Sequence, residues 1–137
     1  MVVAVWSPLP TLDQGPAGVL ALALGQYENY VSPELAELLS TGRRTLDAVF
    51  REVQPVPGGR VYFLASDAPL DMRIAERLSQ QAITNRWIQP HYLQAILTSA
   101  RLADLQRATS EPAPVNRDFR PFLYACHLRH WTRQFDA

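Results

Sequence analysis

Two segments of the chain carry polar side chains that could bind or act on a substrate. Asp13 lies in the turn-forming segment 13–16, and Gln26, Tyr27 and Glu28 directly follow an apolar run. Because α/β sheets bind ligands beyond the carboxyl ends of their strands, Gln26, Tyr27 and Glu28 are candidate substrate-binding residues. Glu28 would be the natural partner of a cation. Asp13 is a candidate catalytic carboxylate. The alternatives are a solvated loop for residues 26–28 and a simple turn residue at Asp13.

The cysteine and histidines near the end of the chain have a spacing that resembles metal ligation. Cys126 and His130 are four residues apart, with His127 between them, but the remaining histidine, His91, lies in a distant segment. Two side chains on one helical face do not make a metal site without a third ligand. We therefore predict no metal site and expect Cys126 to be a small core residue.

Aromatic and arginine residues in the same region have two interpretations each. Tyr124, Trp131 and Phe135 are expected to pack in the core, although Trp131 and Phe135 would also suit the approach to a membrane in a longer parent protein. In the segment 117–120, Arg117 and Arg120 flank Asp118, which predicts a local ion pair and helix cap that contribute little to stability. The alternative is that these residues form a structural clamp at the end of the domain.

The composition sets limits on the class of protein. The 137 residues are 47% hydrophobic and 19% charged, which is typical of a single globular domain. The net charge of +0 provides no general attraction for nucleic acid or anionic lipid. The single cysteine fits a reducing, cytoplasmic compartment. We expect neither a membrane span nor a signal peptide, because the chain has no long apolar run and no basic leader.

Apolar periodicity predicts the elements that position these side chains. Val2–Trp6 is a short strand, and Gly18–Leu24 is an apolar run typical of a parallel strand covered on both faces. Ser32 and Pro33 begin a helix that continues to about Arg51, with Gly42 as a weak point. Val53–Val56 and Arg60–Ala65 flank a glycine turn and predict a hairpin.

Shorter elements follow. Four segments are expected to be helical and one to be a strand; the helices are 70–81, 90–97, 99–109 and 121–135, the last entered through Asp118, and the strand is 83–88. The order of elements indicates half of a doubly wound sheet that ends in an antiparallel pair. The strand Val2–Trp6 would leave an apolar edge that needs a partner.

Several segments, in this order, resemble the spermidine synthase (polyamine aminopropyltransferase) family, and most closely its bacterial forms fused to membrane segments. The similarity covers roughly residues 15–135. It rests on GPAGVL at 15–20, ENY at 28–30, the helix end RRTLDAVF at 43–50, FLAS at 63–66, NRWIQP at 85–90 and VNRDFRP at 115–121. The resemblance implies that residues 1–137 are one partial domain, the C-terminal half of a methyltransferase-type Rossmann fold. Parallel strands, a terminal antiparallel hairpin and flanking helices are then expected.

The family transfers an aminopropyl group from decarboxylated S-adenosylmethionine to an amine such as putrescine. Its cofactor site needs a glycine-rich loop and strand-end carboxylates, and the sequence has no such loop; Pro57-Gly58-Gly59 lies in the expected hairpin. The resemblance therefore implies a domain that binds no cofactor alone and is inactive without a nucleotide-binding half.

Three functions remain open. The chain is a spermidine-synthase-like fragment related to polyamine biosynthesis, a non-enzymatic dimerisation or interaction module derived from that fold, or a small α/β protein with unrelated binding activity. The expected partner is a second copy of the chain or the missing N-terminal half. Nucleic acid is not expected as a partner. A cytoplasmic location is expected, with the cytoplasmic part of a membrane-associated parent as the alternative.

Overall fold

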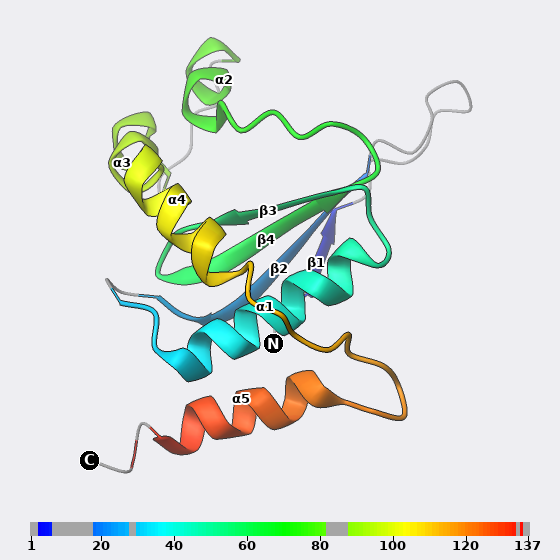
Figure 1. Cartoon of the computed structure of the whole chain (residues 1–137). Helices are drawn as coiled ribbons and strands as arrows, with labels where there is room; N and C mark the ends of the chain where they lie inside the picture. The colour runs from blue at the N-terminus through cyan, green and yellow to red at the C-terminus, as the bar shows by residue number, and fades with distance from the viewer. Residues whose placement is uncertain (1–2, 7–17, 28–29, 82–87, 134, 136–137) are drawn as a thin grey trace.

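A computed structural model describes residues 3–6, 18–27, 30–81, 88–133 and 135. Within these residues the chain is mixed α/β (Figure 1). The strands are β1 (Val3–Trp6), β2 (Val19–Gln26), β3 (Glu52–Val56) and β4 (Arg60–Ser66). The helices are α1 (Pro33–Asp47), α2 (Ile74–Gln80), α3 (Pro90–Ile96), α4 (Ser99–Ala108) and α5 (Phe122–Arg133).

The four strands form one sheet in the order β1-β2-β4-β3, and every neighbouring pair is antiparallel. The hairpin β3–β4 is confirmed. The expected parallel pairing is wrong for the described strands: β1 lies beside β2 and runs against it, with Val3 opposite Leu22 and Trp6 opposite Val19. The expectation that this strand is covered on both faces is also wrong, because Leu24 is the one buried residue of β2 and residues 19–23 are half-buried. An apolar run carries no information about the direction of the neighbouring strand.

The direction of β3 preserves part of the expected architecture. Because β4 is antiparallel to both β2 and β3, the strands β2 and β3 run in the same direction with β4 between them. Helix α1 connects β2 to β3, so β2–α1–β3 is a crossover unit into which the last strand is inserted. The strand β1 lies at the sheet edge, as the sequence predicted for Val2–Trp6.

Local signals explain where α1 begins and ends. The backbone N–H of Leu35 donates to Ser32 Oγ at 3.2 Å, and Pro33 occupies the first turn, as predicted. The helix ends at Asp47, earlier than expected, because the carbonyl of Leu46 accepts from both Val49 and Phe50 and the chain turns there. Helix α2 is also shorter than the predicted 70–81. The carboxylate of Asp71 accepts from the backbone N–H of Arg73 at 3.0 Å and holds a turn where the first helical residues were expected.

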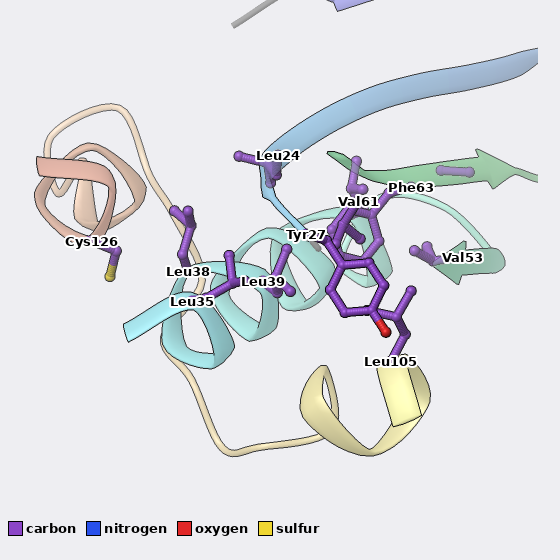
Figure 2. Packing of buried hydrophobic residues seen from close by; sticks show 12 residues of the cluster. Leu24, Tyr27, Leu35, Leu38, Leu39, Val53, Val61, Phe63, Leu105 and Cys126 are labelled. Carbon is purple, nitrogen blue, oxygen red and sulfur yellow. The ribbon is translucent and has the colours of Figure 1, made fainter. Parts of the chain in front are cut away.

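The core lies between the sheet and the helices α1 and α4. Figure 2 shows Val61 and Phe63 of β4 beside Tyr27 and beside Leu105 of α4, and each of these side chains is buried. Helix α5 packs on the other side of α1 (Figure 1), so that the sheet, α1 with α4, and α5 are stacked in sequence.

Gly42 has a packing role that its helix propensity does not reveal. A Cβ atom at this position would lie 2.5 Å from Leu24 Cδ1 and 3.8 Å from Phe63 Cε2. The missing side chain therefore lets α1 approach β2 and β4 closely, which offsets the intrinsic cost of glycine within a helix.

The remaining predictions are resolved only in part. The helices predicted at 90–97 and 99–109 are confirmed as α3 and α4, while the strand predicted at 83–88 falls largely outside the described residues. Among the described helices, none combines the length and apolar character that a membrane crossing requires.

Candidate functional site

The sequence-predicted site residues do not form one cluster in the structure. Asp13 and Glu28 lie outside the described residues. Gln26 ends β2, is exposed, and lies opposite Arg60 of β4. Tyr27 is buried in the core, where its backbone N–H donates to the carbonyl of Gly59 at 3.3 Å. The Tyr27 ring is therefore a packing group rather than part of a solvated loop, and the Arg101 guanidinium lies 5.5 Å from its centroid.

A groove of about 400 Å³ lies where the carboxyl end of β2 meets the start of β4 and the first turns of α5. Its walls come from four separate parts of the chain: Ala23, Leu24, Gly25, Arg60, Asn116, Pro121, Leu123, Tyr124 and His127. Its volume is within the range of small-molecule sites, and it lies at the strand end where ligands were expected.

Asn116 holds in place the start of α5, which forms one wall of the groove. Its backbone N–H donates to Thr45 Oγ1 at 2.9 Å, and its side-chain Oδ1 accepts from the backbone N–H of Leu123 at 2.9 Å. Asn116 thus satisfies an otherwise unpaired donor at the start of α5 and ties that end to α1. The prediction that α5 is entered through Asp118 is wrong, because Asp118 lies in a separate turn before the helix. In this turn the backbone N–H of Arg117 donates to the carbonyl of Arg120, and the N–H of Arg120 donates to the carbonyl of Arg117.

The polar groups of the groove are a guanidinium, an amide, a phenol and an imidazole, from Arg60, Asn116, Tyr124 and His127 respectively. Among the described lining residues there is no carboxylate. This set can donate hydrogen bonds and attract negative charge, and it suits a neutral or anionic ligand better than a cation. The sequence had identified His127 only as a neighbour of Cys126. No local pattern links it to Arg60, which is 67 residues earlier in the chain.

Cys126 and His130 turn inward on α5 toward α1 and the core. Cys126 is buried, as expected for a small core side chain, and burial together with the nearby charge of Glu37 raises the pKa of its thiol. Burial also lowers the pKa of His130, and the electrostatic interaction with His127 lowers it further. Within the part of the chain that the structure describes, no three His, Cys, Asp or Glu side chains come together as a set of metal ligands.

Two aromatic residues of α5, Tyr124 and Trp131, and Phe135 just after its end point away from the core, whereas Phe122 packs against it. Tyr124, Trp131 and Phe135 are exposed, so the prediction that they pack in the core is wrong. The face of α5 that packs against α1 carries Cys126 and two arginines instead. Arg129 pairs with Glu37 at 3.2 Å, and Arg133 pairs with Glu34.

A larger hollow of about 910 Å³ is lined by residues 114, 115, 117–120 and 122. All its walls belong to the single loop before α5 and the first residue of that helix, and Phe119 in this loop is 99% exposed. Because one loop without a facing wall does not enclose a ligand, the groove at the end of β2 is the better candidate site.

Comparisons with protein-family models, with curated proteins and with solved structures find no match to this chain.

Proposed function

We propose that the chain is the C-terminal part of a spermidine-synthase-like domain and that it does not transfer an aminopropyl group by itself. The observation that carries this proposal is the crossover unit β2–α1–β3, with the antiparallel strand β4 inserted beside β2. Several of the segments whose sequence resembles the family, from the apolar strand to FLAS at 63–66, fall within this unit and β4. The similar segments at 85–90 and 115–121 lie outside it. The lone cysteine, Cys126, supports a reducing, cytoplasmic location.

The charge of the groove supports the lack of activity. Putrescine and related amines are cations, and an enzyme that holds them needs carboxylates nearby. The groove presents Arg60 instead, and like charges disfavour binding. A polyamine would therefore be repelled from the described strand end that is most suited to a ligand.

The residues present do not fit the adenosine-containing cofactor of the family. The only adjacent glycines, Gly58 and Gly59, lie in the turn between β3 and β4, and the element that follows them is a strand. Backbone amides that cradle a nucleotide are presented where a glycine-rich turn opens a helix. We therefore derive no reaction step through this cofactor.

Titration calorimetry tests the proposal with decarboxylated S-adenosylmethionine, S-adenosylmethionine and putrescine, each added to the full chain. The expected result is no binding heat above dilution with any of the three. The variant Arg60→Ala is the matched control, because it removes the repelling charge: weak putrescine binding by this variant alone supports the charge argument. Micromolar binding of decarboxylated S-adenosylmethionine by the wild-type chain contradicts the proposal.

A second candidate function is a non-enzymatic interaction module derived from the same fold. It is favoured by one specific observation, the exposure of large apolar side chains on α5, since a surface helix ordinarily presents charged residues to water.

A further inference from the structure

Four exposed apolar side chains lie along the outward side of α5 and just beyond its end, and we call them the aromatic row: Tyr124, Leu128, Trp131 and Phe135. Their exposed fractions are 65%, 42%, 53% and 67%. Trp131 and Phe135 contact each other edge to face, with ring centroids 4.9 Å apart, so the row continues past the end of the helix. Spacings of four and three residues place Tyr124, Leu128 and Trp131 on one stripe of α5, and Phe135 extends this stripe through its contact with Trp131.

The charged residues of α5 are engaged elsewhere. Arg129 and Arg133 pair with Glu37 and Glu34 of α1, on the side of the helix that packs inward. The positions that flank the row within α5 are Ala125, Thr132 and His127. A row this apolar with uncharged or weakly basic flanks marks an interaction surface, because isolated exposed apolar residues are common but contiguous ones are not.

We propose that a second copy of this chain covers the aromatic row, with the two α5 helices packed antiparallel about a twofold axis. This inference deepens the interaction-module candidate and does not depend on the polyamine family. The spacing four–three–four reads the same in both directions. In an antiparallel pair Tyr124 of one copy therefore lies opposite Phe135 of the other, and Leu128 lies opposite Trp131. A twofold interface requires such a self-complementary patch.

Charge and area both fit this occupant. Apolar pairs meet across the axis, so no like charges face each other. A helix that lies on an anionic membrane carries Lys or Arg along its polar flanks, whereas Arg129 and Arg133 are turned to α1 here. The exposed fractions of the four side chains correspond to about 500 Å² on each copy. A total of about 1,000 Å² is at the lower end of specific interfaces, so the dimer is expected to be weak, with a Kd in the micromolar range.

Sedimentation velocity of the full chain over a wide concentration range tests the proposal. We expect reversible dimerisation, weakened at least about tenfold by Trp131→Ala. Tyr92→Ala is the matched control, because Tyr92 is 48% exposed on α3, away from the aromatic row, and its loss should leave the dissociation constant unchanged. Circular dichroism confirms that both variants are folded.

Disulfide trapping tests the orientation. A mixture of the variants Tyr124→Cys and Phe135→Cys should form a mixed disulfide, while Tyr124→Cys alone should not. In the antiparallel pair the two copies of position 124 lie about 16 Å apart, beyond the reach of a disulfide. A chain that stays monomeric overturns the proposal, as does a dimer that Trp131→Ala leaves intact. Flotation of a monomeric chain with phosphatidylcholine or phosphatidylserine vesicles would identify a lipid surface as the occupant and overturn it too. None of these outcomes bears on the calorimetry with the aminopropyl donor.

Discussion

Replacing Gly25 with alanine tests the geometry at the end of β2, where the strand register shifts between Leu24 and Gln26. Gly25 has a φ of 60°, and a Cβ atom there would lie 2.4 Å from Leu35 Cδ1. The left-handed backbone costs an alanine about 1–2 kcal/mol, and the steric conflict costs about 1–3 kcal/mol more. After the gain of about 0.4–1 kcal/mol from a stiffer unfolded chain, the expected loss of unfolding free energy is about 1–4.5 kcal/mol.

Urea unfolding followed by circular dichroism measures this loss as a lower midpoint with an unchanged slope. The matched control is Gly59→Ala, because a Cβ atom at Gly59 has no other atom within 4 Å and its φ is negative or extended. The control should be neutral or slightly stabilising. If Gly25→Ala loses no more stability than Gly59→Ala, the backbone at the end of β2 differs from this description, and the wall of the groove differs with it.

Three further predictions concern single polar groups. Asn116→Ala should destabilise the protein by about 1 kcal/mol in the same urea assay, because the backbone N–H of Leu123 loses its acceptor, whereas Asn116→Asp should retain most of that stability. Hydrogen bonds from Arg73 lower the pKa of Asp71 to about 2, so NMR titration should show the Asp71 carboxylate ionised down to about pH 3. The variant Arg73→Ala should return the pKa of Asp71 toward its ordinary range. An unchanged pKa in this variant would contradict the pairing of Asp71 with Arg73. Burial lowers the pKa of His130, so the folded state binds fewer protons than the unfolded state. The free energy of unfolding should therefore fall as the pH drops below about 6.5. The variant His130→Leu should show a smaller fall, and an equal fall would refute the assignment of this pH dependence to His130.

The parts of the fold that follow from short-range chemistry could be predicted from the sequence. Ser32 and Pro33 mark the start of α1 because capping depends on residues three positions apart. The hairpin β3–β4 follows from two β-rich runs around the glycine turn. These signals lie within one element or one turn, so no knowledge of the rest of the chain is needed.

The parts that depend on distant contacts could not be predicted. The direction of β1 relative to β2 is set by pairing, and the apolar pattern of either strand is compatible with both directions. The groove joins Arg60, Asn116 and His127 from three segments, and no spacing in the sequence relates them. On α5 both sides of the helix carry apolar residues, so periodicity could not tell that Cys126 faces inward and Trp131 outward.

One measurement tests the proposed lack of chemistry most directly. The isolated chain is incubated with decarboxylated S-adenosylmethionine and putrescine, and spermidine is quantified by mass spectrometry beside an active spermidine synthase and a protein-free blank. If the chain is the proposed inactive part of such a domain, with Arg60 in its groove, it should give no more spermidine than the blank. Spermidine formed in proportion to the amount of chain added would contradict the proposal.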